Sequence, residues 1–297
     1  MTTDASIGLI GIGAMGLPMA TNLQRRGHAP WVRDTDPRAV AAATDSGLVA
    51  CDSAAALAQR CDTVIVVVVD AAQVDDVLFG RGGVVHAERP ASAPQQTVVL
   101  CSTIAPDDTV RFCDRLAGHG IATVDAPISG GPARAENGTL SMMVAAEAAT
   151  FARCEPLLRE MASALYAVGE RVGDGARVKL VNNLLAGINL VAGAEGLSLG
   201  SRLGLDRRLL FDVINASSGA SWIFSDRMAR ALVHDFAPRA RAGILTKDVA
   251  LAVQMAADAG VATPLGEQAL AVFRATVAAG FGDADDAAVI RTLDPDF

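Results

Sequence analysis

A glycine-rich turn close to the N-terminus places the strongest limit on the fold. The apolar segment 6–12 is typical of a buried strand, and it leads through the turn into a helical pattern over residues 15–26. Glycines spaced as Gly-x-Gly-x-x-Gly let the backbone approach a pyrophosphate and turn the first N–H groups of the helix toward it. We therefore expect a dinucleotide-binding βαβ unit. Its predicted contacts with the cofactor come from Gly11, Gly13, Ala14, Met15 and Gly16.

Asp34 indicates which dinucleotide the turn accepts. It stands at the end of the predicted second strand, residues 30–33. A carboxylate there accepts hydrogen bonds from the adenosine ribose and repels a 2′-phosphate, so NAD is expected and NADP is less favoured. Arg33 and Arg38 stand nearby, so NADP remains the alternative cofactor. The plainer alternatives are a glycine turn without a ligand and an Asp34 that only caps the next helix.

Strands and helices alternate through the first half of the chain. The apolar patterns predict further strands at 63–69, 97–101, 121–125, 139–145 and 164–168. Helices are expected from residue 37, near 53–59, at 106–118 and at 148–161, and residues 80–96 are expected to form a surface excursion. This alternation is typical of a mostly parallel sheet covered on both faces. We expect an N-terminal Rossmann-type domain, an α/β doubly wound sheet, over residues 1–168.

Only helical signals follow. Residues 176–203 form a pattern for one helix roughly 42 Å long, apolar nearly all round, with small residues that include Gly187, Gly193 and Gly200. A helix without a clear polar face is buried on several sides. We expect residues 169–297 to form an all-α domain for substrate binding and oligomerisation, joined to the first by this long central helix. The expected assembly is a homodimer or homotetramer.

Composition excludes several classes of function. The net charge of −8 repels nucleic acids and anionic lipids, and the longest aliphatic run, Val64–Val69, is far too short to cross a membrane. No leader for secretion is recognisable, and the five cysteines are scattered without metal-binding spacing. These features predict reduced thiols, no metal and a cytoplasmic location. A small anionic substrate would need a local positive site.

Two further segments contain candidate site residues. Ser129, Gly130 and Gly131 follow a predicted strand and expose several backbone N–H groups, which can hold a carboxylate, although a plain turn is the alternative. Lys179 and Asn183 share one face of the long helix in apolar surroundings. Burial favours a neutral lysine that can work as an acid or base. The alternative is a lysine whose head reaches water.

Lys247-Asp248, in an apolar helical stretch, is by itself typical of a surface ion pair. The four histidines form no spacing that indicates a catalytic pair.

Taken together, four ordered motifs resemble the β-hydroxyacid dehydrogenase family, which includes 3-hydroxyisobutyrate dehydrogenases and tartronate semialdehyde reductases. The motifs are the opening glycine turn, the segment Asp125–Leu140, the run Gly173-x-Gly175-x-x-x-Lys179-x-x-Asn182-Asn183, and Lys247-Asp248. The resemblance covers essentially the whole chain. It implies an NAD-dependent oxidoreductase that acts on the hydroxyl of a small anionic hydroxy acid.

The resemblance also implies roles for individual residues. Lys179 is expected to exchange the alkoxide proton, with Asn183 holding the substrate and Ser129, Gly130 and Gly131 holding its carboxylate. Trp222 is expected to contact the substrate. The nicotinamide side is expected to be lined by Val68, Val69, Gln73, Thr103 and Lys247.

Within the family, the chain looks closest to the L-threonate dehydrogenase branch. Asp70-Ala-Ala-Gln73, Ser221-Trp222-Ile-Phe224 and Asp285-Asp286-Ala-Ala are similar to that branch. The pair Asn182-Asn183 departs from it and is similar to the 3-hydroxyisobutyrate enzymes, which puts the substrate in doubt. Two rivals are an imine reductase, against which Lys179 and Asp34 argue, and a non-catalytic NAD-binding module.

Overall fold

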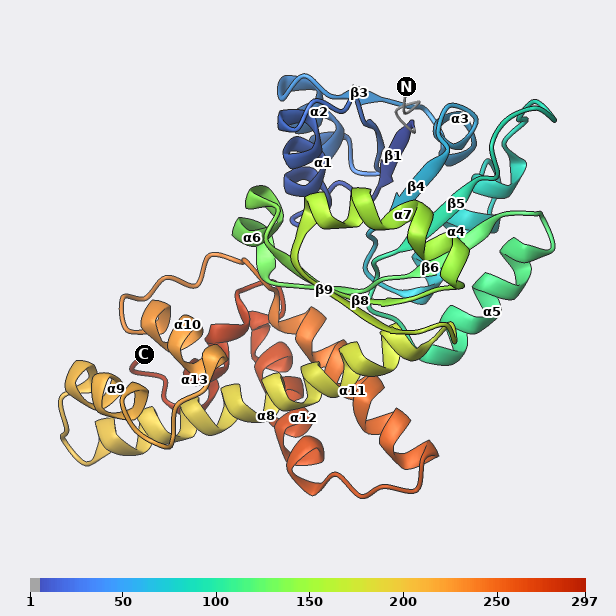
Figure 1. Cartoon of the computed structure of the whole chain (residues 1–297). Coiled ribbons are helices and arrows are strands. Elements are labelled where there is room, and N and C mark those ends of the chain that lie inside the picture. Colours follow the sequence, from blue (N-terminus) through green and yellow to red (C-terminus); the bar gives the residue numbers. More distant parts are fainter. Residues whose placement is uncertain (1–5) are drawn as a thin grey trace. The chain divides into compact units, whose positions relative to one another are not determined.

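The computed structural model describes residues 6–297 of the chain. The chain separates into two compact units, which divide between Lys179 and Leu180 (Figure 1). The change from alternating strands and helices to helices alone comes earlier, after the last strand, which ends at Gly169. The expected domain limits, 1–168 and 169–297, follow that change of pattern and stay a prediction.

A mostly parallel sheet forms the centre of unit 1, as expected from the sequence. Within the described residues its order is β3-β2-β1-β4-β5-β6-β8-β7, and β9 pairs with β8. The strands from β1 to β6 run parallel, whereas β8 is antiparallel to β6 and β7. The strands are β1 (Ile7–Ile10), β2 (Trp31–Arg33), β3 (Val49–Ala50), β4 (Thr63–Val66), β5 (Thr97–Leu100), β6 (Ala122–Asp125), β7 (Ile128–Ser129), β8 (Leu140–Ala145) and β9 (Ala162–Gly169).

Helices cover both faces of this sheet because the strand side chains alternate between two cores. In β4, Ile65 packs on one side with residues of α1, α6 and α7, while Val64 and Val66 pack on the other with α3, α4 and α5. The helices of unit 1 are α1 (Gly16–Arg25), α2 (Pro37–Asp45), α3 (Ala54–Ala58), α4 (Ala71–Phe79), the 3₁₀ turn η1 (Val84–His86), α5 (Pro106–Ala117), α6 (Gly131–Asn137) and α7 (Ala148–Met161).

Five short elements were not expected from the sequence: β3, β7, α4, the 3₁₀ turn η1 and α6. Helix α4 follows the apolar β4 almost without a break, and Asp70 caps it by accepting the N–H of Gln73. Helix α6 lies where the sequence suggests a loop, between Gly130 and Gly138, both at positive φ. A seven-residue helix bracketed by glycines carries too little periodicity to be distinguished from a turn.

Helix α8 (Asp174–Arg202) begins in unit 1 and continues through unit 2, close to the predicted span. Its small residues make close packing possible. A Cβ at Gly187 would lie 2.6 Å from a Val249 methyl, and a Cβ at Gly193 would lie 2.5 Å from the Phe224 ring. These glycines let α10 and α11 approach the α8 backbone.

Unit 2 consists of helices in the part of the chain that the structure describes. Its core joins Leu190, Leu197, Phe224, Val249 and Phe273. Besides α8, the helices are α9 (Arg207–Asn215), α10 (Trp222–Ala231), α11 (Ala242–Asp258), α12 (Pro264–Thr276), η2 (Val277–Phe281), η3 (Asp286–Ala288) and α13 (Val289–Leu293).

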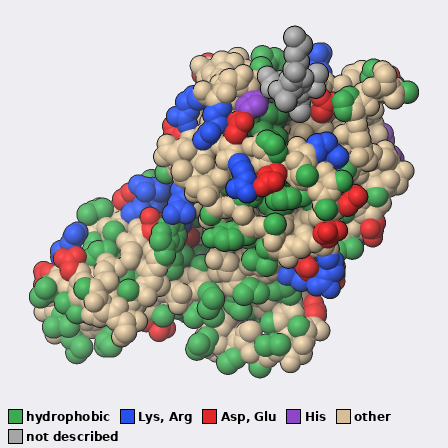
Figure 2. Space-filling view, in the orientation of Figure 1, with side chains coloured by type: hydrophobic (Ala, Val, Ile, Leu, Met, Phe, Trp, Pro, Cys, Tyr) green, Lys and Arg blue, Asp and Glu red, His purple; other side chains and the backbone are tan. Residues whose placement is uncertain are grey.

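One face of α8 remains exposed, contrary to the expectation of burial on several sides. Val178, Val181, Leu185 and Leu199, all on this helix, are 41–63% exposed. Hydrophobic side chains gather on the surface of unit 2 (Figure 2). By length and composition α8 could also cross a membrane, but its other face forms the core of unit 2, as in the central helix of a globular domain. We call the exposed face of α8 the apolar stripe.

Candidate active site

The glycine turn is tightly packed at Gly11 and Gly16, whereas Gly13 faces open space. Gly11 has φ +88°, and a Cβ there would lie 2.3 Å from the Val67 carbonyl oxygen. A Cβ at Gly16 would lie 1.9 Å from the carbonyl oxygen of Gly11, so neither position admits a side chain. Gly13, in contrast, is exposed and faces open space. Between the end of β1 and the start of α1, this cradle fits the pyrophosphate of a dinucleotide.

Asp34, just after the neighbouring strand β2, is hydrogen-bonded to the backbone of the glycine turn. Its Oδ2 accepts the N–H of Ile12 at 2.8 Å, and its Oδ1 accepts the N–H of Asp36 at 2.9 Å. The capping residue of α2 is Asp36, which accepts the N–H of Arg38, so the alternative that Asp34 only caps the next helix is wrong. Arg38 forms an exposed ion pair with Asp36 at 3.0 Å.

Two side chains accept the backbone N–H groups that follow β4. The N–H of Val68 donates to Ser102 Oγ at 2.9 Å, and the N–H of Val69 donates to Gln73 Oε1 at 3.0 Å. Ser102, at the end of β5, was missed from the sequence because a buried serine next to Thr103 carries no pattern of its own. The Gln73 side chain therefore accepts a backbone N–H just after the end of β4.

Parallel strands bring these residues to one edge of the sheet. The glycine turn follows β1, Asp34 follows β2, Val68 follows β4 and Thr103 follows β5, all at carboxyl ends of parallel neighbours. Ligands of open α/β sheets bind at this edge. The topology therefore places the predicted cofactor residues of unit 1 on the expected side.

The predicted carboxylate loop continues from the same edge. Ser129 ends β7 and pairs with Ser141 of β8, which fixes the start of the loop. Gly130 and Gly131 have φ values of +136° and +75°, which are strained for any other residue. A Cβ at Gly131 would meet open space, so the backbone there stays accessible.

Asp125 is a buried acid that the sequence analysis did not single out as a site residue. It ends β6 with 2% of its surface exposed, and its Oδ2 accepts the N–H of Gly173 at 2.9 Å and of Ala176 at 3.2 Å. Burial raises the pKa of its carboxyl to about 6, although these backbone N–H groups act in the opposite direction.

Lys179 and Asn183 lie one turn apart on α8, and each is 7% exposed. Asn183 donates from Nδ2 to Asp248 Oδ2 at 2.8 Å, while Lys247 donates to Asp248 Oδ1 at 2.6 Å. Asp248 is 4% exposed. The sequence-based alternative of a surface pair at Lys247-Asp248 is therefore wrong for the acid, which is buried against α8. Nothing in the sequence relates Asn183 to a residue 65 positions away.

Trp222 is the first residue of α10 and is 58% exposed. Its N-capping neighbour Ser221 accepts the N–H of Phe224 at 3.2 Å. The contact of Trp222 with substrate stays a prediction.

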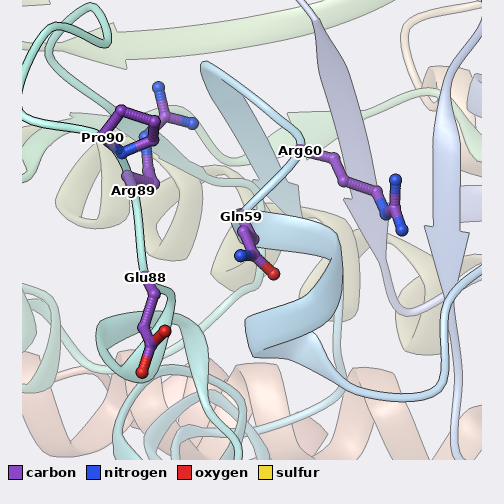
Figure 3. A pocket seen from close by; sticks show the side chains of 5 residues that line it. All are labelled: Gln59, Arg60, Glu88, Arg89 and Pro90. Carbon is purple, nitrogen blue, oxygen red and sulfur yellow. The ribbon is translucent and has the colours of Figure 1, made fainter.

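One surface cavity lies away from these residues. A cavity of about 610 Å³ is lined by Gln59, Arg60, Glu88, Arg89 and Pro90 (Figure 3). It lies before the start of β4, at the opposite edge of the sheet from the glycine turn. Arg89 is occupied there by an ion pair with Asp62 at 2.7 Å. This cavity contains none of the predicted site residues.

Comparison with known proteins agrees with this arrangement. Residues 6–169 match the model of the NAD-binding domain of 6-phosphogluconate dehydrogenase, and residues 173–293 match that of the NAD-binding domain of NADP-dependent 3-hydroxyisobutyrate dehydrogenase. An L-threonate dehydrogenase of Escherichia coli O6:H1 is 36% identical over 292 residues, which cover 97% of this chain and 95% of the relative.

Two further relatives have similar coverage. A 3-hydroxyisobutyrate dehydrogenase of Pseudomonas aeruginosa is 35% identical over 274 residues, covering 90% of each chain. The crystal structure of a 3-hydroxyisobutyrate dehydrogenase from Salmonella typhimurium superposes with a TM-score of 0.88 at 35% identity, covering 97% of this chain and 99% of the other. The chain therefore belongs to the β-hydroxyacid dehydrogenase family, whose members are NAD(P)-binding oxidoreductases that act on hydroxy acids.

Proposed function

We propose that this protein is an NAD-dependent dehydrogenase that oxidises a hydroxyl group of a small polyhydroxy-carboxylate such as L-threonate. The observation that carries the proposal concerns two polar side chains of α8. Lys179 and Asn183 are both buried, and they stand four residues apart on the helix. The similarity to L-threonate dehydrogenases over nearly the whole chain supports this substrate class. The proposed location is the cytoplasm, which agrees with five free, buried cysteines.

The side chains have separate tasks in this proposal. The hydride chemistry is supplied by the bound nicotinamide. In oxidation, neutral Lys179 takes the proton from the substrate hydroxyl, and in reduction its ammonium returns it to the forming alkoxide. Asn183, oriented by Asp248, binds the substrate. The backbone N–H groups of Ser129, Gly130 and Gly131 hold the carboxylate.

NAD is the proposed cofactor because of Asp34, although one matching family model describes NADP-dependent enzymes. The carboxylate stands just after β2 and already accepts two backbone N–H groups. A 2′-phosphate placed beside it would meet like charge.

The second candidate is oxidation of 3-hydroxyisobutyrate, or reduction of tartronate semialdehyde. The pair Asn182-Asn183 favours it, since Asn182 donates to Asn183 Oδ1 at 3.1 Å and both amides stand beside Lys179 on the helix. A smaller, branched substrate would need fewer polar contacts than a polyhydroxy acid.

An NAD-reduction screen tests these assignments. The substrates are L-threonate, D-threonate, 3-hydroxyisobutyrate and glycerate, each with NAD and with NADP, and tartronate semialdehyde is tested in the reductive direction. We expect the highest kcat/KM with L-threonate and NAD. Turnover confined to simple alcohols or cyclic imines would refute both candidates, and NAD binding without turnover of any substrate would favour a non-catalytic module.

A further inference from the structure

The first turn of α8 is fastened to the sheet by one carboxylate. Asp125 Oδ2 accepts the N–H of Gly173 and of Ala176, which lie 48 and 51 residues further along the chain. The first N–H groups of any helix have no partner within the helix. Asp125 therefore fills, from the end of β6, the place of an N-terminal cap for α8.

Close packing at Gly175 supports this attachment. A Cβ on Gly175 would lie 2.9 Å from Asp125 Cγ and 2.7 Å from the Met143 carbonyl oxygen, so only glycine lets the helix reach the strand ends. Residues four apart share a face of a helix. Lys179 follows Gly175 by four, so it lies one turn further along the face that packs on Asp125.

Asp125 itself is held firmly at the edge of the sheet. It pairs with Leu100 on one side and with Ala145 on the other. The chain then runs through Pro127 to Ser129, which is fixed by its pairing with β8. One residue thus connects the start of the predicted carboxylate loop with the helix that carries Lys179.

We propose that Asp125 is a positioning residue for Lys179: its carboxylate ties the first turn of α8 to the end of β6 and so sets the place of the Lys179 amine relative to Ser129. The inference rests on the function proposed above. Asp125 acts through the helix and not on the substrate, so its loss should reduce kcat and leave NAD affinity unchanged, because the glycine turn lies on another strand.

The charge of Asp125 adds a dependence on pH. Burial raises the pKa of its carboxyl to about 6, and Asp174 of α8 also raises it. Arg171 and Arg177 bind Asp174. The two thiols that interact with Asp125 are Cys101, just after β5, and Cys113 of α5, and they stay neutral because burial raises their pKa. Below about pH 6 the carboxylate becomes neutral and holds the helix N–H groups more weakly.

Three variants test the proposal: Asp125→Ala, Asp125→Asn and the control Asp206→Ala. Asp206 also caps a helix, since it accepts the N–H of Leu209 at 2.7 Å, but it is exposed just before α9. We expect Asp125→Ala to lower kcat by about 10²-fold, the usual cost of displacing a reacting group by about 1 Å. In Asp125→Asn one oxygen can still accept both N–H groups, so its kcat should lie between those of Asp125→Ala and wild type.

The pH profile distinguishes positioning from plain stabilisation. Wild-type kcat should fall as the pH decreases through about 6, whereas Asp125→Asn should show no such step and should meet the wild-type curve below it. Equal kcat and pH profiles for wild type, Asp125→Asn and Asp206→Ala would overturn the proposal.

Amide hydrogen exchange tests the attachment of α8 without requiring that the proposed function is correct. Residues 173–179 should exchange faster in Asp125→Ala than in wild type and should be unchanged in Asp206→Ala. An enzyme inactive on every hydroxy acid would refute the proposed function, while the exchange data would still decide whether Asp125 holds α8. Unchanged exchange in both Asp125 variants would contradict the attachment itself.

Discussion

Individual buried polar side chains carry most of the chemistry proposed for this chain. Lys179, Asn183, Asp248 and Asp125 are each less than 9% exposed, and burying such groups is unfavourable unless they are paired. Asp248 and Asp125 both use their carboxylates to orient other groups, the first an amide and an ammonium, the second two backbone N–H groups. Residue-scale predictions therefore concern which group reacts and which groups orient it.

Replacement of Lys179 tests the proton-transfer role. Lys179→Ala should lower kcat by roughly 10²–10⁴, the range for losing a general acid–base group. Lys179→Arg should not restore it, because a guanidinium keeps its proton at any working pH. The measurement is a pH–rate profile with saturating NAD, with Lys247→Ala as the matched cation control. Near-wild-type kcat and an unchanged profile in Lys179→Ala would mean that another group handles the proton.

We predict that Asp34 controls the choice between NAD and NADP. We expect wild type to prefer NAD over NADP by at least about tenfold in kcat/KM, which corresponds to about 1.4 kcal/mol. Asp34→Ala should narrow that ratio and also raise KM for NAD, because the N–H of Ile12 loses its acceptor. Asp36→Ala is the control, since it removes an exposed neighbouring charge and a cap but leaves the glycine turn intact. The assignment fails if wild type uses NADP as well as NAD.

At the scale of elements, unit 2 contains a buried ionic cluster. Asp285 pairs with Arg230 at 2.8 Å and also accepts the N–H of Arg239 at 2.8 Å, and Arg227 pairs with Asp286 at 2.5 Å. Through Asp285 the cluster connects α10, the segment before α11 and η3. It thereby fixes the start of the helix that carries Lys247 and Asp248.

Asp285→Ala should destabilise unit 2 strongly. Burial alone would raise the pKa of Asp285, but its hydrogen bonds with Arg230 and the Arg239 N–H hold that pKa below its ordinary value. Its stabilising effect is therefore present above about pH 4 and is lost as the pH falls through the lower folded-state value. At pH 7 the free energy of unfolding should fall by about 3–5 kcal/mol, as when one partner of a buried pair is removed.

Urea unfolding at pH 7 and at pH 3 checks this, with Asp283→Ala as control. The Asp283 side chain is 96% exposed, so its loss should change the free energy of unfolding by less than about 0.5 kcal/mol. The destabilisation by Asp285→Ala should shrink at the lower pH. Equal stabilities of the two variants at pH 7 would show that the cluster does not hold the unit together.

At the scale of the whole molecule, the apolar stripe on α8 is an exposed hydrophobic surface. Leu205, Leu209 and Val213, the last two on α9, add further exposed aliphatic side chains in unit 2. Large exposed apolar patches mark interaction surfaces. We therefore expect a homo-oligomer, at least a dimer, that buries this stripe.

Light scattering at micromolar concentration measures the assembly. Leu199→Glu places a charge in the stripe and should shift the protein to a smaller species that is still folded, because Leu199 is 63% exposed in the single chain. Leu265→Glu is the control, since Leu265 is 67% exposed on α12, outside the stripe. A monodisperse wild-type monomer, or equal effects of both variants, would contradict a stripe-mediated assembly.

Local sequence patterns by themselves determined much of this protein. The glycine turn, the alternation of strands and helices and the long apolar helix have periods and spacings that are set by neighbouring residues, so the Rossmann-type domain and the helical second half could be predicted. The candidate residues Asp34, Ser129 and Lys179 were found because each stands at a fixed offset from such an element. Elements as short as α6, by contrast, are too small for any period to show.

Only the tertiary structure decided which distant residues meet. Asp248 contacts Asn183 across 65 residues, and Asp125 holds the start of α8 across 48. Such contacts depend on how whole elements pack. A polar residue in an apolar segment gives the same sequence pattern whether its side chain faces water or a buried partner. For the same reason the sequence could not tell that one face of α8 is left exposed, since its apolar residues surround the helix and only packing selects the side that is covered.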